Sequence, residues 1–446
     1  MSSPIMSLSG TRAVIGESFD PKMALEMAMA FGQIRKGSIV VGGDTRQSHD
    51  MVKGCIISGL LSVGASVIDI GKVTTPTLQQ AILHHKAAGG IVITASHNPI
   101  MWNGLKLMNH TGSFLDNQEY AEYMTVYQSK SFQLVSYDKL GTVKDDLNAV
   151  ERHVNKIIST INIDVIRQAN LKVLIDANFG AGAVANPVLL DKLGVQYDMI
   201  GAEPNGLFDH DPEPLEKNLS ALKVGLKQGV YDIGFAQDAD ADRLVILDEN
   251  GCFIGEDYSL AYCMDYVLSK EAHNQTEIVV NLSTSLIIDY LAKKYDVTLH
   301  HTKIGESNVT QKMKACHALV GGEGNGGVIY PKVGWGRDSL VGMTIALKHL
   351  AESKKTVSET ISSYPKYLMF RDKFTVTDQT QVQSFLDKMD TLFPNATVNK
   401  EDGVKILLDD AWVHARPSNT EPIIRLFIEA KSSDTIASLR EKISES

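Results

Sequence analysis

One local plan occurs three times along this 446-residue chain: a short apolar run, then a loop of small polar residues, then a helical pattern. The three stretches are GGIVITASHNP near residue 90, LKVLIDANFGAGAVANPVLLDKL near 171 and EIVVNLSTSLIIDYLAKKY near 277. Strands that alternate with helices form parallel sheets with helices on both faces, and ligands bind at the loops that follow the strands. The sequence therefore predicts three consecutive α/β units.

The last part of the chain follows a different pattern. Four strand-like runs, KFTVT, VKILLDD, AWVHARP and PIIRLFIEA, occur with two helical stretches, TDQTQVQSFLDKMDTLF and DTIASLREKIS. We expect an α/β protein of three consecutive α/β domains, with mixed, mostly parallel sheets around a central cleft, and a C-terminal α+β domain. The expected domains are 1–150 (I), 151–257 (II), 258–368 (III) and 369–446 (IV).

Composition and charge exclude several classes of protein. The net charge of −10 is spread without long blocks of one sign, which argues against a dedicated nucleic-acid or anionic-membrane surface. The first residues lack a secretory pattern, and no apolar stretch approaches membrane-spanning length, so a cytoplasmic location is expected. The four cysteines are far apart, without CxxC or paired-histidine spacing, and support neither zinc nor disulfides.

The stretch TASHNP places Ser96 and His97 directly after a strand-like run. One interpretation is a simple turn, because Pro99 disfavours a helical Asn98 and small polar residues form turns readily. A hydrolase nucleophile elbow is excluded, since neither Thr94 nor Asn98 is a glycine. The alternative is that the Ser96 oxygen carries a phosphate.

The stretch FAQDADADRLVILDENG contains Asp238, Asp240 and Asp242 at alternate positions. In an extended segment their carboxylates project to one side and repel one another unless a cation lies among them. A solvated acidic turn is the simpler alternative. An EF-hand is excluded because Arg243 replaces the required glycine and both flanks are strand-like. Few carboxylates together with a phosphate oxygen would suit Mg²⁺.

Two further loops carry groups suited to a sugar phosphate. GGEGNGGVIYP places Glu323 and Asn325 among glycines, which allow close approach to a ligand. ARPSNTEP gathers donors that fit a phosphate, with Arg425 expected near them on the following strand. The donors are Arg416, Ser418, Asn419 and Thr420.

Three other polar segments allow a purely structural interpretation. VVGGDTRQS, with Asp44 and Arg46, and KVTTPTLQQA could be only a strand exit and a helix cap. In VGWGRDSL, Arg337 and Asp338 could pair with each other and brace the loop.

Taken together and in this order, the four main motifs resemble the α-D-phosphohexomutase family, whose members move phosphate between positions 1 and 6 of hexoses. The resemblance covers essentially the whole chain. It implies that Ser96 is phosphorylated and that Asp238, Asp240 and Asp242 bind one Mg²⁺ per active site, with a phosphoserine oxygen as the fourth anionic ligand. It also implies a hexose 1,6-bisphosphate as intermediate and activator.

The resemblance assigns roles to the remaining motif residues. Glu323 and Asn325 would contact sugar hydroxyls, although many members have Ser in place of Asn325. Arg243 would also bind substrate. SGTR matches the family's N-terminal arginine loop at Arg12, though Ala13 replaces its usual glycine, and NGLK matches an NGxK segment with Lys106. The phosphate that does not react would be held by Arg416, Ser418, Asn419, Thr420 and Arg425.

Proton transfer is the least determined role. Some relatives have a histidine where this chain has Gly327, so Lys106 is the expected group, supported by Arg12 and His97. Cations nearby would lower the pKa of Lys106. The alternative is a purely electrostatic lysine.

The GGEGNGG and GRDS forms resemble a subgroup whose members are phosphoglucosamine mutases in some bacteria and phosphomannomutases/phosphoglucomutases in archaea. Glucosamine phosphate is the expected substrate. A phosphomannomutase/phosphoglucomutase is the alternative, and a phosphoserine-dependent sugar phosphatase or a non-catalytic sugar-phosphate binder is a remoter one. The expected partner is a small phosphosugar, not a nucleic acid or membrane, and the expected state is a monomer or homodimer.

Overall fold

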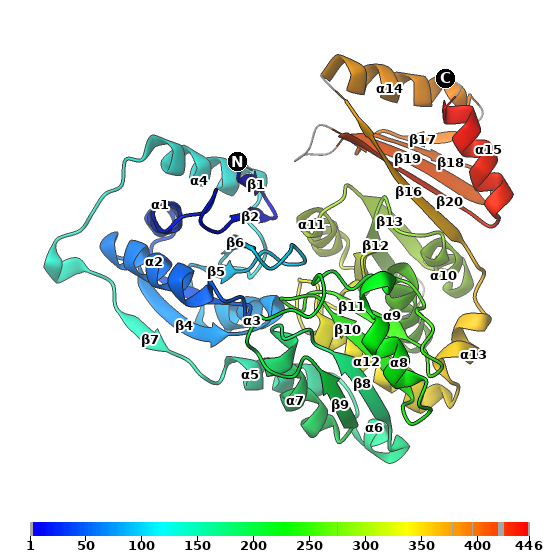
Figure 1. Ribbon diagram of the computed structural model, residues 1–446, viewed down its shortest axis with the longest axis horizontal. Helices are drawn as coiled ribbons and strands as arrows, with labels where there is room; N and C mark the ends of the chain where they lie inside the picture. Colours follow the sequence, from blue (N-terminus) through cyan, green and yellow to red (C-terminus); the bar gives the residue numbers. More distant parts are fainter. Residues whose placement is uncertain (1–2, 274, 377–378, 395, 418–422, 445–446) are drawn as a thin grey trace. The chain divides into compact units, whose positions relative to one another are not determined.

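The computed structural model describes residues 3–273, 275–376, 379–394, 396–417 and 423–444 (Figure 1). The chain divides into two compact units. The first comprises Met1–Tyr266 and Asn325–Ile361, and the second comprises Val267–Gly324 and Ser362–Ser446.

The first unit begins with a seven-stranded sheet. Its strands are β1 (Ile5–Ser7), β2 (Gly10–Val14), β3 (Ser38–Gly43), β4 (Ser66–Lys72), β5 (Gly89–Ile93), β6 (Trp102–Asn109) and β7 (Val143–Asp145). Their order is β1-β2-β6-β5-β3-β4-β7, with β5-β3-β4-β7 parallel and the β1, β2 and β6 pairings antiparallel. The helices are α1 (Pro21–Ile34), α2 (His49–Ser62), α3 (Thr75–His85), α4 (Asn117–Ser129), η1 (Tyr137–Lys139) and α5 (Ala149–Ile158).

Helices cover both faces of this sheet because its central strands are apolar on both sides. Ile39 and Val41 of β3 belong to a core cluster with residues of α1 and α2. Val40, which points the other way, belongs to a second cluster with Leu78 and Ile82 of α3. An uninterrupted apolar run is therefore the expected sequence of a strand buried on both faces.

The first unit contains a second, four-stranded sheet. Its strands are β8 (Lys172–Asp176), β9 (Gln196–Ile200), β10 (Ile233–Gln237) and β11 (Leu244–Leu247), in the order β11-β10-β8-β9. Only β11 is antiparallel to its neighbour. The helices are α6 (Asp164–Ala169), α7 (Gly182–Leu193), η2 (Glu216–Asn218) and α8 (Ser220–Leu226). Strand β15 (Gly327–Ile329) and helix α12 (Ser339–Ser353) complete the unit, while α9 (Glu256–Glu271) and α13 (Val357–Ser362) cross its limits.

The second unit contains three parallel strands in the order β13-β12-β14. These are β12 (Glu277–Asn281), β13 (Thr298–Thr302) and β14 (Val320–Glu323), connected by α10 (Ile287–Tyr295) and α11 (Glu306–Cys316). The loops after β12 and β14 consequently leave the same edge of the sheet, as the parallel arrangement requires.

The chain ends in an antiparallel sheet with the order β16-β20-β19-β18-β17. The strands are β16 (Leu368–Thr375), β17 (Thr397–Asn399), β18 (Val404–Leu407), β19 (Ala411–Pro417) and β20 (Ile423–Ala430). Helices α14 (Gln379–Leu392) and α15 (Ser433–Ser444) contribute to one core on one face of the sheet (Figure 1). The buried face of β20 carries Ile424, Leu426 and Ile428, as alternation predicts. The short strand β17 is not apparent in the sequence pattern.

The predicted fold class is confirmed: three consecutive α/β domains with mixed sheets precede a C-terminal α+β domain. In the described residues, no helix combines the length and the apolar character that a bilayer crossing requires.

Candidate active site

The Ser96 loop connects β5 to β6 and holds the serine in an unusual backbone conformation. Ser96 has φ of 51°, in the left-handed region that residues other than glycine rarely adopt. Its N–H donates to Thr94 Oγ1 at 2.8 Å, and Thr94 Oγ1 donates to Asp44 Oδ2 at 2.5 Å. The side chains before the serine therefore fix the direction in which its hydroxyl points.

The three aspartates lie in the turn between β10 and β11, and all are fully buried. The expected extended geometry is wrong: Ala241 has φ of 53°, and the Asp242 N–H donates back to Asp238 Oδ1 at 3.1 Å. The carboxylates converge because the chain turns around Asp238, not because alternate residues of a strand share a face. Strands on both sides of the turn confirm that the loop is not an EF-hand.

The turn brings the acidic residues to the serine. Ser96 Oγ donates to Asp238 Oδ2 at 3.1 Å across 142 positions of sequence. Asp238 directly follows β10 and Ser96 lies three residues after the end of β5, and loops after parallel strands are where α/β proteins place their ligand sites.

Cationic and hydroxyl groups surround the three carboxylates. Lys106 Nζ donates to Asp240 Oδ2 at 2.6 Å and to Asp242 Oδ2 at 2.7 Å. Arg337 Nη2 donates to Asp242 Oδ2 at 2.9 Å. The interpretation that Arg337 only braces its own loop is therefore wrong.

The polar segment before α3 has two functions. Thr74 caps α3 by accepting from the Thr77 N–H, as the structural interpretation of KVTTPTLQQA predicts. The next residue, Thr75, donates from Oγ1 to Asp240 Oδ2, and its N–H donates to the Asp240 carbonyl at 3.0 Å. The N-terminal end of α3, which Thr74 caps, thus also contacts the acidic turn through Thr75.

Burial and mutual repulsion set the protonation of this cluster. Burial, then Asp242 and Asp240, raise the pKa of Asp238 well above its usual value. Arg337 and Lys106 overcome the opposing effect of burial and lower the pKa of Asp242. Burial also opposes the charge of Lys106, but Asp240 and Asp242 raise the Lys106 pKa. The lowered pKa expected for Lys106 is therefore wrong, because carboxylates and not cations are its nearest neighbours.

The chemistry of the cluster fits a hard divalent cation. Ligand oxygens of Asp238, Asp240 and Asp242 lie within 4.8 Å of one another. Asp240 Oδ1 and Asp242 Oδ1 are buried and make no hydrogen bond among the described residues. Buried carboxylate oxygens without a donor are costly, and a cation relieves both the missing contacts and the repulsion.

His97 and Arg12 lie at the same loop. His97 Nδ1 lies 3.3 Å from Ser96 Oγ, and Arg12 Nη1 donates to Asn98 Oδ1 at 3.2 Å. Burial, then Arg243 and Arg12, lower the pKa of His97 well below its usual value. The imidazole is therefore neutral near pH 7.

Arg243 follows the acidic turn and remains close to its carboxylates. Arg243 Nε lies 3.8 Å from both Asp238 Oδ2 and Asp242 Oδ1, and Arg243 Nη1 lies 3.7 Å from Glu213 Oε1. The first unit thus brings together the expected residues Arg12, Ser96, His97, Lys106, Asp238, Asp240, Asp242 and Arg243.

In the second unit, Glu323 ends β14 with its carboxylate held in place. Glu323 Oε1 accepts from Asn281 Nδ2 at 2.9 Å and from the Gly305 N–H at 3.0 Å. Glu323 is only 3% exposed, so its remaining oxygen has a fixed direction. Asn325 belongs to the first unit, where its Oδ1 accepts from the Gly327 N–H at 3.3 Å.

Arg416 and Arg425 are directly opposite each other on β19 and β20, which confirms their expected proximity. Arg416 Nε lies 3.5 Å from Asp402 Oδ1. Burial lowers the pKa of Arg416, whereas Asp402 and Glu323 raise it and Arg425 lowers it. Glu323, Arg416 and Arg425 therefore share one electrostatic environment. The expected phosphate donors Ser418, Asn419 and Thr420 lie outside the described residues.

Comparison with known families covers nearly the whole chain. Residues 5–133, 151–251 and 255–367 match the phosphoglucomutase/phosphomannomutase alpha/beta/alpha domains I, II and III, and residues 373–446 match the C-terminal domain of the same family. A protein of Thermococcus kodakarensis named phosphoglucomutase/phosphomannomutase is 36% identical over 434 residues, covering 95% of this chain and 94% of that protein. The chain belongs to the phosphoglucomutase/phosphomannomutase family. It is an isomerase of the phosphohexomutase class.

Two more comparisons agree with this assignment. A probable phosphoglucosamine mutase of Methanococcoides burtonii is 33% identical, covering 98% of this chain and 97% of that protein. The crystal structure of a phosphoglucomutase/phosphomannomutase family protein from Burkholderia thailandensis has the same fold, with a TM-score of 0.86, 24% identity and coverage of 99% and 97%.

Arg46 of this phosphohexomutase holds the Ser96 loop in place, a role that the sequence pattern does not indicate. Its side chain is fully buried, and Nη1 donates to the carbonyls of Pro99 and Trp102 at 2.8 and 2.9 Å. Nη2 donates to the carbonyls of Ser96 and Asn98 at 2.8 and 2.6 Å. Arg46 Nε lies 3.3 Å from Asp44 Oδ2. One guanidinium thus binds four carbonyls of the Ser96 loop. The sequence of this segment indicates only the end of a strand.

We expect Arg46→Lys to loosen this loop and destabilise the protein. A lysine ammonium cannot reproduce the planar fork, so at least two buried carbonyls lose their donor, which costs about 2–4 kcal/mol of unfolding free energy. Urea denaturation measures the loss. Arg167→Lys is the matched control, because the Arg167 side chain is 49% exposed and donates to the Lys192 carbonyl only at the surface. Equal stability of the two variants would contradict the role of Arg46.

Proposed function

We propose that this isomerase interconverts hexose 6-phosphate and hexose 1-phosphate through a phosphorylated Ser96 and a hexose 1,6-bisphosphate. The observation that carries the proposal is the 3.1 Å contact of Ser96 Oγ with Asp238 Oδ2, within a buried turn of three convergent carboxylates. The hydroxyl lies where a cation and a phosphate would complete the charge balance.

The reaction would consist of two opposite transfers. In the first, the bond between phosphorus and Ser96 Oγ breaks, and phosphorus forms a bond to the oxygen of one sugar hydroxyl. The proton of that hydroxyl passes to Ser96 Oγ. In the second, the bisphosphate gives its other phosphoryl group to Ser96 Oγ and the proton returns to the sugar. Atoms and charge therefore balance over a turnover, and the enzyme ends phosphorylated as it began.

The three aspartates would hold Mg²⁺ together with an oxygen carried on Ser96. When bound, the ion would neutralise charge on the transferring phosphoryl group, which is where phosphoryl transfer needs most assistance. Lys106 and Arg337 fix two of the carboxylates before any ligand arrives. Such preorganisation lowers the reorganisation required during the reaction.

The contacts favour the alternative of an electrostatic Lys106. Its ammonium is bound to two carboxylates that raise its pKa, so it is a poor proton acceptor. We propose that His97, whose Nδ1 lies 3.3 Å from Ser96 Oγ, assists proton transfer by hydrogen bonding to this oxygen. Arg12 would support the loop through Asn98, and Arg243 would contact substrate.

The GGEGNGG and ARPSNTEP loops would supply the remaining substrate contacts. Glu323, held by two donors, is suited to a pair of sugar hydroxyls, and Asn325 would assist it. The paired Arg416 and Arg425 offer a phosphate two guanidinium groups from neighbouring strands. Ser418, Asn419 and Thr420 would add hydroxyl and amide donors.

We propose glucosamine 6-phosphate as the preferred substrate. The relative named probable phosphoglucosamine mutase supports this choice. The relative named phosphoglucomutase/phosphomannomutase supports the alternative of glucose and mannose phosphates. The three sugars differ at carbon 2, so direct competition between them distinguishes the candidates.

Ser96→Ala should abolish both phosphorylation and turnover. Loss of a covalent nucleophile typically lowers kcat by at least about 10⁴-fold. Intact mass spectrometry should show one phosphoryl group per chain in the wild type and none in the variant. Ser58→Ala, which changes an exposed serine of α2, should retain both. Normal turnover by Ser96→Ala would refute the phosphoserine mechanism.

Removal of the cation should stop turnover without removing the phosphoryl group. Treatment with EDTA should lower kcat by at least about 10²-fold, because the charge of the transferring group is no longer neutralised, and Mg²⁺ should restore it. Asp240→Asn should raise the Mg²⁺ concentration required for activity. Asp248→Asn, which changes a buried aspartate of the next turn, should not. Full activity in EDTA would contradict the assignment of the aspartates.

With catalytic hexose 1,6-bisphosphate, we expect kcat/KM for glucosamine 6-phosphate to exceed that for glucose and mannose 6-phosphates by roughly tenfold or more. The assay should follow 1-phosphate formation and free phosphate separately. A preference for glucose or mannose phosphate would establish the alternative substrate. Release of free phosphate in place of isomerisation would identify a phosphatase and refute the mutase proposal.

A further inference from the structure

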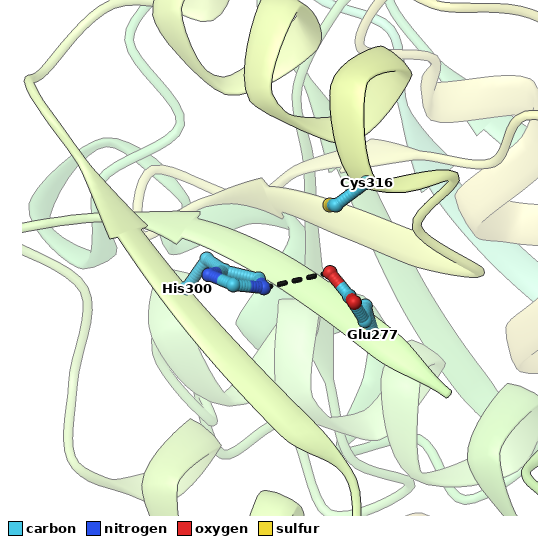
Figure 2. Close-up of side chains that lie close together, drawn as sticks. All are labelled: Glu277, His300 and Cys316. Carbon is cyan, nitrogen blue, oxygen red and sulfur yellow. Dashed lines mark hydrogen bonds and ion pairs between the residues drawn. The ribbon is translucent and has the colours of Figure 1, made fainter. Parts of the chain in front are cut away.

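A second group of metal-ligating side chains lies in the second unit, and the proposed reaction does not use it. Glu277, His300 and Cys316 each offer one ligand atom, and these atoms lie within 4.8 Å of one another. Figure 2 shows the imidazole and the carboxylate facing each other, with the thiol directed toward them. In the described residues, this group and the three aspartates are the two clusters with metal-ligand spacing.

Backbone pairing brings the three residues together from separate elements. Glu277 begins β12 and His300 lies on β13, where Glu277 pairs with Thr298 and Val279 pairs with His300. Glu277 and His300 are thus diagonal neighbours on one face of the sheet. Cys316 ends α11, and the Leu319 N–H three residues later donates to the Glu277 carbonyl at 2.9 Å. Two paired strands and the end of a helix therefore fix the positions of the three residues.

The side chains already interact with one another. His300 Nε2 lies 2.7 Å from Glu277 Oε2. Hydrogen bonds from Cys316 and His300 lower the pKa of Glu277, so the carboxylate is charged. Burial and Glu277 raise the pKa of the Cys316 thiol to about 11, so the thiol keeps its proton until a stronger electrophile replaces it. All three side chains are partly accessible, which leaves an entry path for an ion.

We propose that Glu277, His300 and Cys316 form a site for a borderline-soft divalent metal ion of the Zn²⁺ type, with water as the fourth ligand. One carboxylate oxygen, one imidazole nitrogen and one sulfur form a tetrahedral Zn²⁺ donor set, whereas Mg²⁺ and Ca²⁺ avoid sulfur and prefer oxygen. Binding releases the thiol proton and replaces the hydrogen bond between His300 and Glu277 with two bonds to the ion.

The position of the site in the sheet indicates a structural role. Glu277 begins β12, whereas Asn281, the donor to Glu323, ends it. Four strand steps separate the two residues by about 13 Å. A metal at Glu277 would therefore tie β12, β13 and α11 together at the edge opposite the sugar loop.

Cobalt titration of the full-length, metal-stripped protein tests this proposal. Excess Mg²⁺ should be present throughout to fill the oxygen site. One equivalent of Co²⁺ should produce a thiolate-to-cobalt charge-transfer band, which Zn²⁺ then removes. Cys316→Ser should abolish the band, and His300→Ala should weaken Co²⁺ binding by at least about tenfold. Cys252→Ser, at an exposed cysteine outside the cluster, should leave both unchanged.

Two outcomes would overturn the site: no charge-transfer band in the wild type, or a band that persists in Cys316→Ser. Circular dichroism of each variant separates loss of the site from loss of the fold. A structural role further requires Zn²⁺ to raise the thermal midpoint of the wild type but not of Cys316→Ser, and equal midpoints would refute that role. None of these measurements depends on mutase activity, so the result is independent of the proposed reaction.

Discussion

The repulsion among Asp238, Asp240 and Asp242 is the constraint around which the first unit is organised. Burial and the neighbouring carboxylates raise the pKa of Asp238 well above its usual value. The protein counters the repulsion with an ammonium and a guanidinium, which come from the seven-stranded sheet and from the segment before α12. Distant parts of the sequence are thereby required to meet at one turn, and Ser96 is placed where they meet.

The arrangement also separates two tasks that a phosphoryl-transfer site must combine. Lys106 and Arg337 bind the Oδ2 atoms, while Asp240 Oδ1 and Asp242 Oδ1 keep their lone pairs without a donor. One side of the cluster is therefore neutralised by the protein, and the other remains available to a cation. This division explains how an acidic turn can be stable in the folded chain and still bind a metal strongly.

Much of the fold could be predicted because it depends on local pattern. The buried strand β3 is apolar at every position that a two-faced strand requires, and β20 alternates as a one-faced strand should. The Ser96 and aspartate motifs were apparent for a similar reason, since their residue types are informative at short spacing. Two predictions were wrong: the extended geometry of the aspartate segment and the lowered pKa of Lys106. Both depend on geometry that the local sequence does not contain. The carboxylates converge through a turn at Ala241, and the charge state of Lys106 depends on partners more than 130 positions away.

The Glu277, His300 and Cys316 cluster shows the same limit more strongly. Its members are separated by 23 and 16 positions, so no ligand spacing can be recognised, and only the register of β12 and β13 with the end of α11 assembles them. The family assignment likewise does not determine which sugar phosphate is the substrate. Relatives of similar identity carry names with different sugars, so membership of the family does not by itself identify the sugar.

The manner in which Arg46 holds the Ser96 loop has an evolutionary consequence. Within this loop the guanidinium binds main-chain oxygens and no side chain, and Ile100 and Met101 of the loop are 42% and 53% exposed. Neutral drift at those two positions can alter the outer surface of the loop while its path through space is inherited unchanged. Substitutions at these two positions can therefore change the exposed surface of the loop without displacing Ser96.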